Sequence, residues 1–160
     1  MSRFWIGIAS RNHAKAAEAG GFCQLGHGKE APVRRLLPGD GLVYYAPREG
    51  MRDGPKVQAF VAIGRILPGE VYRAQQSECF HPYRRDVSYF QAKDAEIALL
   101  KDDLSFSARG ARWSMMMRQG LFEIPAEDFS AIARAMDAEM NSAGTAFGMA
   151  DGAKRITNDE

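Results

Sequence analysis

The sequence is poor in cysteine and has no long apolar run, and each shortage excludes a class of protein. Two cysteines, Cys23 and Cys79, among 160 residues are too few for a disulfide framework, which favours a reducing, cytoplasmic setting. No apolar segment approaches the roughly 20 residues that a membrane-spanning helix needs. The opening residues, MSRFWIGIAS, lack the apolar core and the cleavage site of a signal peptide. We therefore expect a cytoplasmic protein that has no membrane partner.

The sequence also lacks an excess of charge of either sign. Its formal net charge is +1, so any basic surface must come from local clustering rather than from the overall composition. The hydrophobic content of 46% and the charged content of 26% are typical of a globular chain, and the length predicts one domain. We expect this domain to span residues 1–140 and the Gly- and Ala-rich residues 141–160 to form a mobile tail.

Short apolar runs separated by turn residues predict an α+β fold. Strands are expected over residues 4–10, 41–47, 57–67, 80–90 and 121–124, and helices over residues 13–19, 32–37 and from 125 onward. Residues 95–100 fit a strand or a helix. Because the strands are short and do not alternate regularly with helices, a small, partly closed barrel is the natural way for them to bury one face.

The segment GGFCQLGHGK, residues 20–29, combines four glycines with a lysine, as phosphate-binding loops do. It does not match a nucleotide P-loop, because Glu30 stands where Ser or Thr should follow the lysine, and Cys23 stands where the first glycine should fall. A dinucleotide fingerprint fits poorly as well. The segment therefore needs another explanation: a metal site, a catalytic turn or one wall of a pocket.

The cysteines and histidines do not have the spacing of a metal site. Cys23 lies four residues before His27, and Cys79 lies two residues before His81, which matches no common structural zinc pattern. Nothing local indicates a group that would lower the pKa of either thiol for nucleophilic catalysis. We expect no metal and no cofactor.

Arginines alternate with aromatic residues in two parts of the chain. Residues 104–122 contain no acidic residue but carry several arginines together with Phe106 and Trp113, and residues 80–90 pair two arginines with tyrosines. Arginine binds phosphate oxygens and aromatic faces stack on bases, so the pattern suits a nucleic-acid surface as well as an ordinary core with solvated cations. The candidate phosphate-binding rim is Lys29, Arg84, Arg85, Arg109, Arg112 and Arg118.

Five segments, in this order, closely resemble the EVE domain family, in particular its small stand-alone bacterial branch. They are FWIGIASRNHA, GGFCQLGHGKEAPVRRLLPGDGLVYYAPR, QAFVAIGRI, FHPYRRDVSYF and RQGLFEIPAEDF, and the resemblance runs from about Phe4 to Met136. It implies a PUA-like fold, a mixed, pseudo-closed barrel flanked by helices. EVE domains are similar to YTH and ASCH domains and are thought to bind nucleic acid and to hold a modified base, such as a methylated cytosine.

The resemblance implies a non-catalytic module for DNA or RNA that carries a modified base, with the glycine segment beside an aromatic-lined pocket. Trp5, Ser10, Gln24, His27 and either Tyr44 or Tyr45 are expected to converge there. From the strand pattern itself, Arg85 shares a face with Tyr83 and Tyr89, so we expect Arg84 to be the more exposed of the two arginines. The full candidate pocket is Trp5, Ser10, Gln24, His27, Tyr44, Tyr45, Phe80 and His81.

Two other functions stay open at this point. ASCH relatives include an amidohydrolase that acts on acetylated cytidine, and such chemistry needs a lysine, a carboxylate and a hydroxyl together. Lys29 and Glu30 are available, but neighbouring residues in an extended loop point apart, and no matching threonine is evident. A sensor of free nucleosides is the third possibility, because a free nucleoside needs no basic track.

Overall fold

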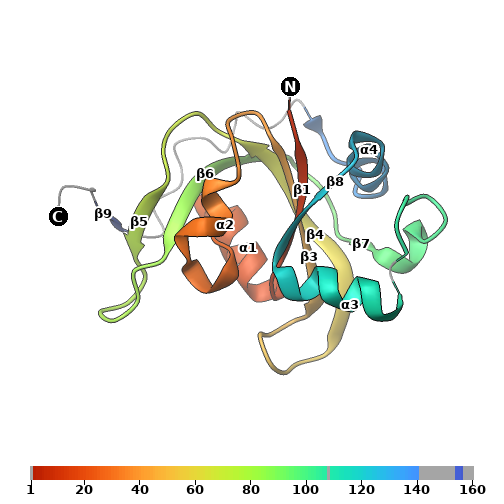
Figure 1. Ribbon diagram of the computed structural model, residues 1–160, viewed down its shortest axis with the longest axis horizontal. Coiled ribbons are helices and arrows are strands. Elements are labelled where there is room, and N and C mark those ends of the chain that lie inside the picture. Colours follow the sequence, from red (N-terminus) through yellow and green to blue (C-terminus); the bar gives the residue numbers. More distant parts are fainter. Residues whose placement is uncertain (1, 108, 141–153, 157–160) are drawn as a thin grey trace.

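A strongly curved mixed sheet forms the centre of the computed structural model, which describes residues 2–107, 109–140 and 154–156 (Figure 1). The strand order is β8-β1-β3-β4-β6-β5-β9, with β2 paired to β6 and β7 paired to β4. Of the described pairings, β1 with β3 is parallel and the others are antiparallel. The strands are β1 (Phe4–Ile8), β2 (Phe22–Cys23), β3 (Gly41–Arg48), β4 (Lys56–Ile66), β5 (Tyr72–Gln75), β6 (Tyr83–Tyr89), β7 (Ala95–Glu96), β8 (Leu121–Ile124) and β9 (Lys154–Ile156).

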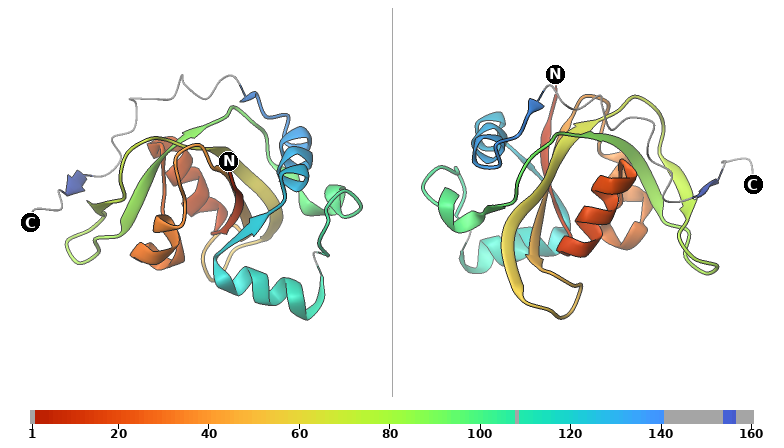
Figure 2. Two further views of the ribbon diagram at one scale, coloured as in Figure 1. Left: turned by 45° about the horizontal axis from the view of Figure 1, so that its top comes forward. Right: turned by 180° about the vertical axis from the view of Figure 1, so that it is seen from behind.

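Helices cover both faces of this sheet, and each face has its own hydrophobic core (Figure 2). The inner core lies within the curve of the sheet, beneath α1 and α2, and the outer core lies beneath η2, α3 and α4. The helices are α1 (Arg11–Gly20), α2 (Glu30–Arg34), α3 (Gly110–Gln119) and α4 (Ala126–Ala135), and the 3₁₀ turns are η1 (Gly26–Gly28) and η2 (Ile97–Leu100).

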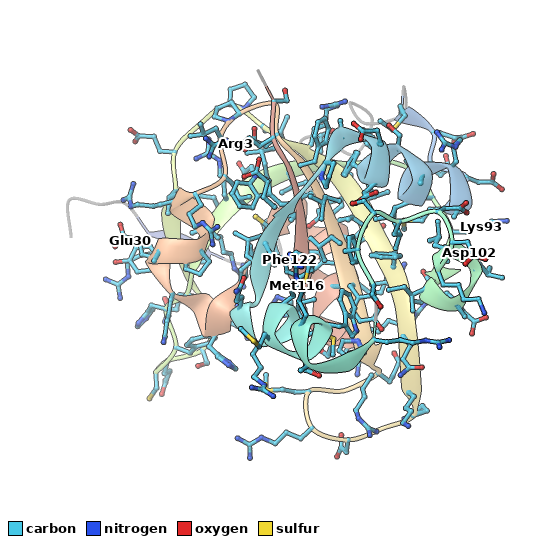
Figure 3. All side chains as sticks on the ribbon, turned by 45° about the vertical axis from the view of Figure 1, so that its right-hand side comes forward. Arg3, Glu30, Lys93, Asp102, Met116 and Phe122 are labelled. Atoms are coloured by element: carbon cyan, nitrogen blue, oxygen red, sulfur yellow. The ribbon has the colours of Figure 1, made fainter. Side chains whose placement is uncertain are left out.

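Alternation along the strands assigns side chains to the two cores. Trp5 and Tyr44 belong to the inner core, whereas Ile6 and Tyr45 belong to the outer core, as expected for neighbours on a pleated strand. In the outer core, Trp113 of α3 lies edge-on to Tyr45, with 5.4 Å between ring centroids. Trp113 is the one buried residue of α3, and Figure 3 shows the same helix running past β8.

The helix ends follow local chemistry. Ser10 precedes α1, and its Oγ accepts a hydrogen bond from the backbone N–H of His13 at 3.2 Å, so the helix begins at Arg11, ahead of the expected start at residue 13. Gly21 closes α1 with a φ of 73° and Gly120 closes α3 with a φ of 76°, a left-handed conformation that glycine adopts without strain.

The α+β class and the partly closed barrel are confirmed, with local differences from the expected elements. Residues 80–82 belong to the turn before β6, because Ser77 and Phe80 form an isolated bridge there. Residues 95–100 contain both alternatives, the short strand β7 and the turn η2. Of the expected mobile tail, residues 154–156 form β9 beside β5, and the others lie outside the described residues. Within the described part of the chain, no helix is long and apolar enough to cross a membrane.

Candidate nucleic-acid interface

The ends of three elements meet where β1 leads into α1, at a place that we call the β1–α1 corner and define as residues 8–13 together with Gln24, which contacts His13. The backbone N–H of Ile8 donates to the carbonyl of Gly120 at the end of α3, at 2.8 Å. The N–H of Asn12 donates to the carbonyl of Glu49, just past β3, at 3.0 Å. The first turn of α1, the exit of β3 and the end of α3 therefore surround the same corner.

The segment after β2 packs back over β1 beside this corner. A Cβ atom on Gly7 would lie 2.7 Å from Cδ2 of Leu25, so the glycine lets the segment approach the strand closely. The Tyr44 hydroxyl accepts from the N–H of Gln24 and donates to its carbonyl, at 3.1 Å each. The Nε2 atom of His13 lies 2.9 Å from the same carbonyl. The main chain at Gln24 is thus fixed on two sides.

The Gln24 side chain is fixed by a buried arginine. Its Oε1 accepts from Nε of Arg84 at 2.8 Å, and Oε1 of Gln76 accepts from Nη2 of the same guanidinium at 3.1 Å. The guanidinium carbon lies 3.8 Å from the centroid of the Phe22 ring, within cation–π range. Arg84 is 4% exposed and has no ion pair with any described residue. The amide end of Gln24 has no bonding partner among the described residues.

The two side chains that hold the main chain of Gln24 and the neighbouring Cys23 thiol are neutral at physiological pH. Burial lowers the pKa of His13, and burial raises the pKa of the Cys23 thiol to about 12. Burial also raises the pKa of the Tyr44 phenol. A site made of neutral donors and acceptors beside one cation is suited to hydrogen bonding with a planar polar ligand, and its thiol is not activated as a nucleophile.

The other expected pocket aromatics are buried in the two cores. Trp5 is 1% exposed, and its Nε1–H donates to Oδ2 of Asp40 at 3.0 Å. The guanidinium of Arg35 covers its ring at 4.9 Å. Tyr45 lies in the outer core, on the other side of the sheet from Tyr44. Of the expected set, Gln24 and Tyr44 are in contact, and Ser10 lies at the corner as the cap of α1.

The remaining expected pocket residues gather at a separate surface corner. A Cβ atom on Gly28 would lie 2.6 Å from Cβ of Pro82 and 2.9 Å from the Phe80 ring, so the glycine segment packs against the turn before β6. His27 is exposed at a φ of 62°, and His81 is half-buried beside Pro82. The glycines at 26 and 28 therefore allow close packing within the protein, at Pro32 and Pro82 respectively.

The expected basic rim divides into exposed and buried members. Arg109, Arg112 and Arg118 are exposed along α3, and Lys29 is exposed beside η1. Arg84 and Arg85 are 4% and 6% exposed, so the expectation of an open rim there is wrong, as is the expectation that Arg84 is the more exposed of the two. Arg84 is buried because β2 pairs with the neighbouring residues of β6, and this pairing places Phe22 and Gln24 over Arg84.

The sequence analysis missed three residues that contact Gln24 or its partner Arg84: His13, Phe22 and Gln76. His13 had a detectable signal, since it stands in the first helical turn after a strand, three residues beyond a capping serine. Phe22 and Gln76 had none. Among the described residues, no three His, Cys, Asp or Glu side chains are grouped as metal ligands, and Cys23 is buried while Cys79 is exposed.

The curved sheet with helices on both faces has the architecture that the sequence resemblance implied, a PUA-like barrel. A model of the EVE domain matches residues 3–135, and the chain belongs to this family. It is 44% identical over 140 residues to a UPF0310 protein of Mesorhizobium japonicum, covering 86% of this chain and 94% of that relative. It is 38% identical over 135 residues to the UPF0310 protein YdcG of Bacillus subtilis, covering 84% and 92% of the two chains.

A solved structure shows the same fold at low sequence identity. The NMR structure of Rpa0253 from Rhodopseudomonas palustris matches with a TM-score of 0.50 and 17% identity, covering 84% of this chain and 93% of that one.

Proposed function

We propose that this protein is a non-catalytic nucleic-acid-binding module that holds a modified base, for example a methylated cytosine, at the β1–α1 corner. The observation that carries the proposal is the fixation of Gln24. Its main chain is held by Tyr44 and His13 and its side-chain oxygen by Arg84, so the amide NH₂ is presented in one orientation. Base edges are read by donors and acceptors that are held in fixed positions before the ligand arrives.

The exposed arginines of α3 support a polymeric ligand over a free nucleoside. Arg118 stands two residues before Gly120, whose carbonyl bonds to Ile8 of the corner. A strand whose base enters the corner would therefore place neighbouring phosphates near α3, where no acidic residue lies between 104 and 122. Phosphate contacts supply most of the affinity in such complexes.

The arrangement gives less support to an amidohydrolase. Glu30 forms an ion pair with Arg34 within α2, and Lys29 is exposed ahead of that helix. A lysine that acts as a nucleophile or a base needs a buried setting and a partner that lowers its pKa. Lys29 lacks the buried setting, because its side chain is exposed.

Binding measured by fluorescence anisotropy tests the proposal. Single strands of DNA and RNA of about 12 nucleotides would carry one central methylated cytosine, one methylated adenine or no modification. We expect the parent protein to prefer one modified strand by about tenfold, as one well-placed set of base contacts provides. The variant Gln24→Ala should lose this preference and keep most of its affinity for the unmodified strand.

The matched control is Gln75→Ala, which removes an exposed glutamine from β5. It should keep the preference of the parent. Equal affinity of the parent for every modified and unmodified strand would refute base recognition, and tight binding of a modified nucleoside alone would favour a sensor.

A further inference from the structure

The β3–β4 hairpin extends beyond the rest of the sheet at the same end of the molecule as α3 (Figures 1 and 2). Its tip is residues 49–55, and its cations are Arg48, Arg52 and Lys56, all exposed and none in an ion pair with a described residue. Met51, at the tip, is 72% exposed. Met51 therefore stands between Arg48 and Arg52 with most of its side chain open to a ligand.

The hairpin is bent, and two backbone hydrogen bonds span its tip, from the N–H of Glu49 to the carbonyl of Pro55 and from the N–H of Gly50 to the carbonyl of Asp53. The β3–β4 register shifts between Tyr44 and Tyr45 and again between Ala46 and Arg48, as β-bulges do, and bulges bend the strand that carries them. Gln58 of β4 has a φ of 50°, a left-handed conformation that a non-glycine residue adopts only at an energetic cost. Strain of this kind concentrates at functional sites.

The root of the hairpin is tied to the corner that carries Gln24. The carbonyl of Glu49 accepts from the N–H of Asn12, and its carboxylate lies 3.5 Å from Nη1 of Arg11. Both contacts are in the first turn of α1, which also contains His13, the residue that holds the carbonyl of Gln24. The hairpin and the base-binding corner are thus joined through three consecutive residues.

Positive charge accumulates on the hairpin and α3 although the whole chain is almost neutral. The two segments present six cations against two carboxylates, and one of these, Glu49, is engaged with Arg11. Acidic residues gather elsewhere, after η2 and on α4; Figure 3 shows Asp102 on the η2 side. The cations are Arg48, Arg52, Lys56, Arg109, Arg112 and Arg118.

We propose that the β3–β4 hairpin is the second side of a nucleic-acid track: a single strand with one base in the corner runs between α3 and the hairpin. Arg52 and Lys56 contact its phosphates, and Met51 packs against a neighbouring unstacked base. This inference rests on the proposed function and adds to it a surface that the sequence resemblance does not assign. Cations interleaved with an exposed apolar side chain fit a strand with bases and phosphates better than a purely acidic peptide.

The double variant Arg52→Ala/Lys56→Ala tests the track without touching the corner. Anisotropy with a labelled single strand of about 12 nucleotides would be followed from about 0.05 to 0.2 M salt. We expect about tenfold weaker binding and a salt slope smaller by about 1.4, because each phosphate contact to a single strand contributes about 0.7. The preference for the modified strand should be unchanged.

The matched control is Lys101→Ala/Arg134→Ala, which removes the same charge from exposed positions near η2 and on α4. It should bind like the parent. Thermal unfolding of both variants would show whether they are folded, and Arg52→Glu/Lys56→Glu should weaken binding further.

Three other results would overturn the inference. If hairpin and control variants bind with equal affinity and slope while the parent prefers a modified strand, the track is wrong and the proposed function stands. If poly-glutamate competes with the strand as well as unlabelled strand does, the partner is an acidic protein. If the parent binds no strand at about 0.05 M salt, both the track and the proposed function fail.

Discussion

The buried carboxylate of Asp40 holds the beginning of β1 in place at the inner core. It is 2% exposed and accepts three hydrogen bonds, from the indole of Trp5 and from the backbone N–H groups of Arg3 and Leu37, each at 3.0 Å. Trp5 is therefore held as part of the interior, with its polar atom satisfied, and is not available to stack on a ligand without a rearrangement at Asp40.

Asp40→Ala should destabilise the protein by about 3–5 kcal/mol, since it leaves buried donors without a partner, each costing about 1–3 kcal/mol. Asp40→Asn should cost less, because its amide oxygen can still accept. Chemical denaturation with both variants measures the difference. If Asp40→Ala is as stable as the parent, the hydrogen bonds contribute nothing to folding.

At the scale of elements, the turn η1 is defined by close packing against the turn before β6. Gly28 has a φ of 80° and Gly120, at the end of α3, has a φ of 76°. The two differ in surroundings: a Cβ on Gly28 would meet Pro82 and Phe80, whereas a Cβ on Gly120 would meet nothing within 4 Å. Comparing substitutions at these two glycines therefore separates the free-energy cost of a left-handed backbone from that of a steric overlap.

Gly120→Ala should cost about 1–2 kcal/mol from its backbone conformation alone. Gly28→Ala should cost a further 1–3 kcal/mol or so, because the added methyl must displace the backbone and ring of Pro82. Equilibrium unfolding in urea gives both values. Equal losses for the two variants would show that η1 adapts without strain.

The longer elements could be predicted from sequence and the short ones could not. The strands at 41–47 and 57–67 were clear from their apolar, β-branched composition, and the alternation of Tyr44 and Tyr45 followed from the pleat. The two-residue strand β2 is too short to show an alternation of apolar and polar residues. The burial of Arg84 beneath it could therefore not be predicted from the sequence. The resemblance to EVE domains named Gln24 as a candidate, whereas its contacts with His13 and Arg84 depend on the folded chain.

At the scale of the whole molecule, near-zero net charge coexists with two surfaces of opposite sign. The acid-free run from 104 to 122 carries three exposed arginines, Arg109 at the start of α3 and Arg112 and Arg118 within it. Because surface charges act over about 10 Å at 0.1 M salt, this local excess would govern the approach of the proposed strand more than the total charge would.

Arg109→Ala/Arg112→Ala should therefore weaken binding of a single strand and reduce its salt dependence, by about 0.7 in slope for each phosphate that is no longer neutralised. Binding of a free nucleoside should stay the same, since the corner is untouched. Anisotropy for the strand and calorimetry for the nucleoside measure the two effects. A double variant that binds strands like the parent at every salt concentration would leave α3 without a role in binding.

The two tryptophans occupy different cores, and this gives the molecule two built-in optical reporters. Trp5 lies 1% exposed within the inner core, beneath the Arg35 guanidinium, and Trp113 lies 6% exposed in the outer core, stacked on Phe106 at 5.7 Å. Replacing either tryptophan by phenylalanine leaves a single fluorophore that reports on one side of the sheet. Emission from Trp113 would follow events at α3, such as the arrival of a strand, while emission from Trp5 would follow the state of the layer beneath α1 and α2.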